Sequence, residues 1–179
     1  MGVLAWYSDF DGVFNIPQRS GLTVTAAIEP ENSDFLVNHR SISWNPEVLE
    51  VFMEMLATGK YDFTWLTTWN DAGNIELAAK TMGISEVCKH ITAQLDKEAR
   101  GKKAWTRWKA ETIIADQANN PRPYIWVDDE APTFWEDHVR GHTLAPALVI
   151  KTHNSKGLTK KDLVKIIDWT LENQHWGRK

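Results

Sequence analysis

Residues 4–14 of the chain read LAWYSDFDGVF, and this stretch decides the fold. Its first residues, Leu4 to Tyr7, form a short apolar run typical of a buried strand. Two aspartates with one residue between them, Asp9 and Asp11, come after Ser8 and are followed by Gly12. Asp-x-Asp-Gly after a strand also suits an Asx turn, so the motif alone leaves both a turn and a functional site open.

The rest of the chain alternates strand-like and helix-like segments. A helix is predicted over Asn45–Gly59, with Asn45 as its N-cap and Pro46 at its first helical position. Because strands alternate with helices, we expect an α/β fold of three layers, a Rossmann-like parallel sheet with helices on both faces. The other expected strands are 4–8, 61–69, 87–92, 124–130 and 147–152, and the other expected helices are 71–82, 102–118, 132–141 and a last one from Thr159.

Residues 15–44 do not follow this alternation. The segments 22–28 (LTVTAAI) and 35–44 (FLVNHRSISW) are predicted to pair as a β-hairpin. The region is too short to hold a core of its own, so we interpret it as a flap over the site and not as a large cap. The chain is therefore predicted to form one domain, residues 1–179.

Composition narrows the class of protein. Hydrophobic residues make up 42% and charged residues 25%, which is ordinary for a globular protein, and no apolar run is long enough to span a bilayer. The single cysteine, Cys88, excludes an intrachain disulfide and suits a reducing cytoplasm. The net charge of −4 gives no overall attraction to nucleic acid. The oligomeric state does not follow from these data.

Polar side chains follow three of the predicted strands. They are Asp9 and Asp11, then Thr67–Thr68, then Asp128–Asp129. Ligands of open parallel sheets bind beyond the carboxyl ends of the strands, so we expect these groups to converge. Converging carboxylates repel each other unless a cation compensates them.

Oxygen-only ligands favour Mg²⁺ as that cation, whereas one cysteine and six scattered histidines do not favour zinc. The same groups suit phosphoryl transfer. One aspartate would attack phosphorus, and a second would protonate the leaving oxygen and later activate water. Hydroxyls at another strand end, together with a lysine, would hold the remaining phosphate oxygens.

These motifs resemble the haloacid dehalogenase (HAD) superfamily. YSDFDGVF is similar to its first motif, FTWLTTW to its second and YIWVDDE to its fourth, with a lysine ahead of the last one as the third. Order and spacing fit from about residue 4 to 152. More narrowly, DFDGVFN, WLTTWND and LVIKTHNSKGLTKKDL resemble the HAD domain of "Swiss army knife" RNA-repair proteins and of bacterial and phage proteins.

The resemblance implies a role for each acid. Asp9 matches the nucleophile and a metal ligand. Asp11 matches the general acid/base, which also gives its backbone carbonyl to the metal. Asp128 matches the second metal-binding acid, with Asp129 behind it as a further candidate ligand. The implied cofactor is Mg²⁺.

The phosphate-binding residues follow from the same resemblance. Thr67 matches the phosphate-binding hydroxyl, supported by Thr68 or by the backbone amide of Trp69. Lys103 and Lys102 are the candidate lysines, with Lys103 slightly preferred and both Lys97 and Lys109 ranked below them. Trp69 and Arg40, the latter on the flap, are candidate substrate contacts.

The sequence therefore predicts a Mg²⁺-dependent phosphatase that acts through an aspartyl-phosphate, with nucleic-acid ends or nucleotides as the leading substrate class. A small-metabolite phosphatase and a non-catalytic interaction module, such as a phage factor that binds a host protein, remain as alternatives. The basic stretch 97–109 contains Trp105 and Trp108. It is either a track for a nucleic-acid backbone or a helix whose tryptophans pack into the core.

Overall fold

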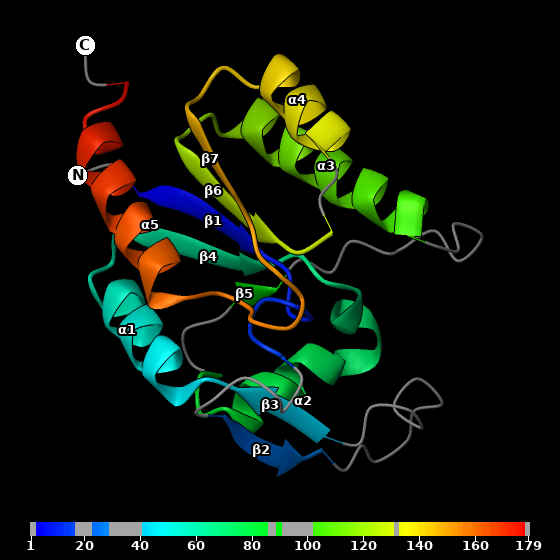
Figure 1. Ribbon diagram of the computed structural model, residues 1–179. Coiled ribbons are helices and arrows are strands. Elements are labelled where there is room, and N and C mark those ends of the chain that lie inside the picture. The colour runs from blue at the N-terminus through cyan, green and yellow to red at the C-terminus, as the bar shows by residue number, and fades with distance from the viewer. Residues whose placement is uncertain are drawn as a thin grey trace.

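A computed structural model describes residues 3–16, 23–28, 41–85, 89–90, 102–130 and 133–177. Five parallel strands form the central sheet in the order β5-β4-β1-β6-β7 (Figure 1). This confirms the predicted α/β fold with a parallel sheet. The first strand of the chain is thus the middle strand of the sheet. The strands are β1 (Leu4–Ser8), β4 (Tyr61–Trp65), β5 (Lys89–His90), β6 (Tyr124–Asp128) and β7 (Ala147–Lys151).

Helices cover both faces of the sheet (Figure 1). On one face α1 (Pro46–Ala57) and α5 (Lys160–Asn173) pack together, and on the other α3 (Lys102–Asn119) contacts α4 (Thr133–His142). Successive side chains of β1 point to opposite faces of the sheet, and each face has its own hydrophobic cluster. Trp6 packs in the cluster beneath α1 and α5, whereas Ala5 and Tyr7 pack in the cluster beneath α3. None of the described helices has the length and apolar character to cross a membrane.

Local signals in the sequence set the helix ends. Asn45 Oδ1 accepts hydrogen bonds from the amides of Glu47 (3.0 Å) and Val48 (3.3 Å) at the start of α1. Thr159 and Asp162 form a complete capping box at the start of α5. The helix predicted over 71–82 is shorter, because a 3₁₀ helix, η2 (Thr68–Gly73), precedes α2 (Asn74–Thr81).

The two ends of the predicted flap pair as expected. Strands β2 (Val24–Ala27) and β3 (Ser41–Trp44) are antiparallel, with Thr25 opposite Ser43. Ile42 and Trp44 face the core and are buried, while Ser41 and Ser43 lie on the other face of the strand. Arg40 lies outside the described residues, and the flap as a unit over 15–44 stays a prediction.

The loop after β7 braces the loop after β1. The Thr152 hydroxyl donates to the Gly12 carbonyl at 2.7 Å, and the Leu158 amide donates to the Val13 carbonyl at 2.8 Å. Gly157 lies in this contact between the two loops and has a φ of +64°. A Cβ on Gly157 would come within 2.4 Å of the Val13 carbonyl oxygen. This brace fixes the turn that follows Asp9 and Asp11.

Gly157→Ala tests the brace, with Gly59→Ala as a matched control. Both glycines have a left-handed φ, but a Cβ on Gly59 would meet nothing within 4 Å. We expect Gly59→Ala to lower the free energy of unfolding by about 1–2 kcal/mol from backbone strain alone. Gly157→Ala should lower it by about 1–3 kcal/mol more, because the methyl group overpacks the contact. Urea unfolding measures both, and equal losses would contradict the close approach.

Candidate active site

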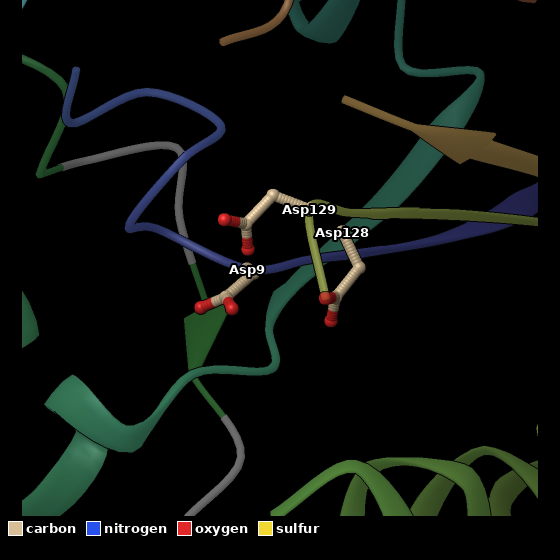
Figure 2. Close-up of side chains that lie close together, drawn as sticks. All are labelled: Asp9, Asp128 and Asp129. Carbon is tan, nitrogen blue, oxygen red and sulfur yellow. The ribbon is translucent and has the colours of Figure 1, made fainter. Parts of the chain in front are cut away.

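Three carboxylates converge at the carboxyl ends of β1 and β6. Asp9 follows β1, Asp128 ends β6 and Asp129 comes next, and the Asp9 amide donates to the Val127 carbonyl at 2.9 Å. Figure 2 shows the three side chains close together. Each offers an oxygen within 4.8 Å of the others, and Asp9 and Asp128 are buried. The predicted convergence of these acids is what the structure shows.

The cation beside these carboxylates is Lys109 of α3. Its Nζ donates to Asp9 Oδ2 and, at 2.8 Å, to Asp128 Oδ2. Burial opposes the charge on Lys109, but the two carboxylates outweigh it and raise the pKa of its ammonium above the ordinary value. Lys109 therefore stays charged and ties α3 to the middle of the sheet.

This placement differs from the ranking made from the sequence, which preferred Lys103 and then Lys102. Those two residues lie at the start of α3, about 9–11 Å from Lys109 along the helix axis, and their side chains lie outside the described residues. Lys109 falls within the buried face of the helix, but this face contains polar as well as apolar side chains, so periodicity in the sequence marks it only weakly. The other buried members of that face are Thr106, Ala110, Ile113 and Gln117.

Among the described side chains, one ammonium faces three carboxylates and does not balance them. Burial raises the pKa of Asp9 to about 7 against the opposing charge of Lys109, and the charge of Asp128 adds to the rise. Burial also raises the pKa of Asp129 to about 6, with further contributions from Asp128 and Glu130. A second cation would relieve this repulsion, and the all-oxygen donors fit the hard ligands that Mg²⁺ takes.

Asp11 lies apart from the group of three acids. Its Oδ1 accepts a hydrogen bond from Asn15 Nδ2 and its Oδ2 accepts one from the indole Nε1 of Trp69, both at 2.7 Å. Asn15 in turn accepts the amide of Ser43 on β3 at 3.0 Å. Two donors therefore fix the orientation of the Asp11 carboxylate. Metal binding through its backbone carbonyl stays a prediction.

The loop after β4 carries the threonines. Thr67 is fully buried, and its Oγ1 accepts the Trp69 amide at 3.3 Å; Thr68 begins η2. Trp69 is also fully buried and packs edge-on against Phe10, with ring centroids 4.9 Å apart. The indole of Trp69 is therefore enclosed and donates to Asp11, a role that the sequence did not indicate, and a substrate contact by Trp69 stays a prediction.

A cavity of about 430 Å³ opens beside Asp11. Its described walls come from the loop after β1, the β2–β3 hairpin, the end of β6 and the loop after β7. Asp11 and Asp129 reach this wall, whereas Asp128 and Lys109 are buried behind it. The hairpin thus borders the space in front of the acids.

The basic stretch 97–109 divides between surface and interior. Trp105 is 38% exposed, and exposed Arg107 pairs with Glu111 at 2.7 Å. Trp108 packs against the core cluster beneath α3, and Lys109 is inside the site. Residues 97–101 lie outside the described part of the chain, so a nucleic-acid track there stays a prediction.

The histidines are less scattered than the sequence reading held. His138 and His142 lie four residues apart on α4, with ring centroids 4.5 Å apart. Zinc in structural sites takes four ligands, and in the described part of the chain the three aspartates are the one group of three or more candidate ligands. The pair therefore does not alter the preference for Mg²⁺.

Thermal unfolding with and without MgCl₂ tests the cation site. In the folded protein the pKa values of Asp9 and Asp129 are raised above the ordinary carboxyl value of 3.8. The metal-free folded protein therefore binds more protons than the unfolded chain between about pH 4 and 7. Its stability contribution from these groups is lost as pH rises through that window. Mg²⁺ competes with those protons, so its stabilising effect should be larger at pH 8 than at pH 5.

Asp128→Asn should remove most of the Mg²⁺ effect at pH 8, whereas Asp137→Asn, an exposed position on α4, should leave it unchanged. The same rise in unfolding temperature at both pH values, or in all three proteins, would contradict a cation site at these acids.

The comparison with known families agrees with this geometry. The family model described as "HAD domain in Swiss Army Knife RNA repair proteins" matches residues 7–163, which include all three acids and Lys109. No curated protein and no solved structure gives a significant match. The chain belongs to the family of HAD domains in Swiss Army Knife RNA repair proteins, a branch of the haloacid dehalogenase hydrolases.

Proposed function

We propose that this domain is a Mg²⁺-dependent phosphomonoesterase that works through an aspartyl-phosphate on Asp9. The observation that carries the proposal is the convergence of Asp9, Asp128 and Asp129 with Lys109 at the ends of two neighbouring strands. Membership of a hydrolase family supports it. Mg²⁺ held by these acids would neutralise charge on the phosphate oxygens.

The first half of the reaction is an attack by Asp9. One carboxylate oxygen of Asp9 forms a bond to phosphorus while the ester bond to the leaving alcohol breaks. Lys109 already donates to Asp9 Oδ2, so it orients that carboxylate and offsets its charge. The Thr67 hydroxyl, at the end of the neighbouring strand β4, donates to a phosphate oxygen.

Asp11 moves the proton in both halves. Its carboxyl gives a proton to the departing alkoxide, and the resulting carboxylate then takes one from the attacking water. That water displaces phosphate from Asp9, so both aspartates return to their starting forms. The two donors on Asp11, Trp69 and Asn15, set the direction in which its carboxylate points.

The substrate class that we propose is a phosphorylated nucleic-acid end or a nucleotide. Its support is the family description, which names RNA repair proteins. Exposed Trp105 and Arg107 on α3 are compatible with a contact to a nucleic-acid strand.

Asp9→Asn tests the nucleophile. With p-nitrophenyl phosphate and Mg²⁺, we expect its kcat/KM to fall by at least about 10³-fold, because an amide does not form the acyl-phosphate. Removing Mg²⁺ with EDTA should abolish activity of the unsubstituted protein. Asp137→Asn serves as the control and should keep full activity. Persistent turnover by Asp9→Asn would rule out the proposed mechanism.

Trp69→Phe tests the orientation of Asp11. The ring is kept while the N–H to Asp11 is lost, so proton delivery should weaken. An alkyl phosphate, whose leaving group needs the proton, should lose about 10-fold or more in kcat, out of the 10²–10⁴-fold that such catalysis supplies. p-Nitrophenyl phosphate, with its good leaving group, should lose much less.

Trp65→Phe is the matched control. Trp65 is equally buried and contacts Phe10, but its Nε1 has no hydrogen-bond partner among the described residues. Any loss of kcat in Trp65→Phe should be the same for the alkyl and the aryl phosphate. The same ratio of alkyl to aryl phosphate rates in both variants would show that Trp69 has only a packing role.

A further inference from the structure

We propose that the cavity beside Asp11 binds the leaving group and selects a neutral, hydroxyl-bearing group of about the size of one sugar, such as ribose. The inference rests on the proposed phosphatase function and specifies its substrate. The cavity of about 430 Å³ lies at the lower end of the range for ligand pockets. That volume suits a single small unit.

The place of the cavity identifies which part of the substrate it meets. Asp11, the group that gives a proton to the leaving oxygen, lies in its wall together with Asp129 and Gly12. Lys109 and Asp128, which serve the phosphate side, are not part of that wall. A phosphate at Asp9 would therefore have its ester oxygen toward Asp11 and its alcohol in the cavity.

The hairpin supplies a row of hydroxyl groups to this space. Thr25, Ser41 and Ser43 all line the cavity. Thr25 and Ser43 are opposite each other, and their hydroxyl oxygens lie 2.7 Å apart. Since side chains alternate along β3, Ile42 and Trp44 lie on the face opposite to Ser41 and Ser43, where they pack into the core and hold the hydroxyl face outward.

Amide groups complete the described wall. Asn15 comes from the loop after β1, and Asn154 comes from the braced loop after β7. The Asn15 amide already bonds Asp11 and Ser43, whereas Asn154 is exposed and presents both a donor and an acceptor. Groups that both donate and accept are suited to the hydroxyls of a sugar or polyol.

The same wall disfavours two other classes of ligand. The charged groups among its described residues are the carboxylates of Asp11 and Asp129, which would repel a second phosphate on the leaving group. None of the described residues of this wall is aromatic, so they offer no ring on which a nucleobase would stack. The chemistry is that of a neutral, hydroxyl-rich group.

The test measures KM and kcat for ribose 5-phosphate and for phenyl phosphate, in the presence of Mg²⁺. Ser41→Ala and Asn154→Ala are the variants, because both side chains are exposed and line the cavity. Each should raise KM for ribose 5-phosphate by about 2- to 10-fold, which is the effect of losing one neutral hydrogen bond. KM for phenyl phosphate should not change, because its leaving group has no further hydroxyl.

Ser155→Ala is the control in the same loop, because its hydroxyl bonds to His153 and does not line the cavity. It should change neither KM. If the Ser41 and Asn154 variants change KM equally for both substrates, or for neither substrate, the sugar subsite is overturned while the phosphatase function stands. Hydrolysis of neither substrate by the unsubstituted protein would instead refute the proposed function, and the subsite with it.

Further substrates separate the sources of the sugar. Ribose 1,5-bisphosphate should have a lower kcat/KM than ribose 5-phosphate, and a preference for the bisphosphate would overturn the inference. Oligonucleotides with a terminal phosphate, in ribose and deoxyribose forms, report whether the sugar belongs to a strand end. If only the ribose oligonucleotide has a higher kcat/KM than free ribose 5-phosphate, the subsite belongs to an RNA end. If both oligonucleotides have a lower kcat/KM than ribose 5-phosphate, the subsite belongs to a free sugar phosphate.

Discussion

The site depends on a buried ammonium, that of Lys109, which is shared by the carboxylates of Asp9 and Asp128. It joins α3 to the carboxyl ends of β1 and β6, so the packing of the helix and the geometry of the site depend on each other. Removing Lys109 would leave both carboxylates buried without their shared cation, and breaking a buried pair in this way typically costs about 3–5 kcal/mol. The excess of negative charge that remains is what makes the place suitable for a metal cation.

Two aspartates that are two residues apart have different surroundings. Asp9 lies at the end of β1, among buried charges. The chain then turns at Gly12, which has a φ of +67° and whose lack of a Cβ leaves room for the Asp129 carboxylate. Asp11 is held by Trp69 and Asn15 instead. The turn therefore separates two groups of the same chemistry into one that faces Asp128 and one that faces the cavity.

The hairpin has a part in both the core and the site. Its apolar face packs through Ile42 and Trp44 into the cluster beneath α1, and its hydroxyl face borders the cavity. The Ser43 amide is bonded to Asn15, which is bonded to Asp11, so the position of β3 and the orientation of Asp11 are coupled through one side chain. This coupling connects the β2–β3 hairpin to the side chain that we propose as the general acid/base.

Local patterns were sufficient for most of the architecture. Apolar runs and the N-cap at Asn45 predicted the elements, and the alternation of strands and helices predicted the parallel sheet that brings Asp9 and Asp128 together. These signals are readable because strand and helix periods act over a few residues.

The lysine and the partners of Asp11 were decided only by the tertiary structure. Lys109 is 100 residues from Asp9 in the chain, and the orientation of α3 on the sheet decides which of its lysines reaches the acids. Trp69 is 58 residues from Asp11, and nothing in the sequence around it distinguishes an indole that donates from one that only packs. Long-range packing fixes such contacts, whereas local sequence fixes the segments that make them.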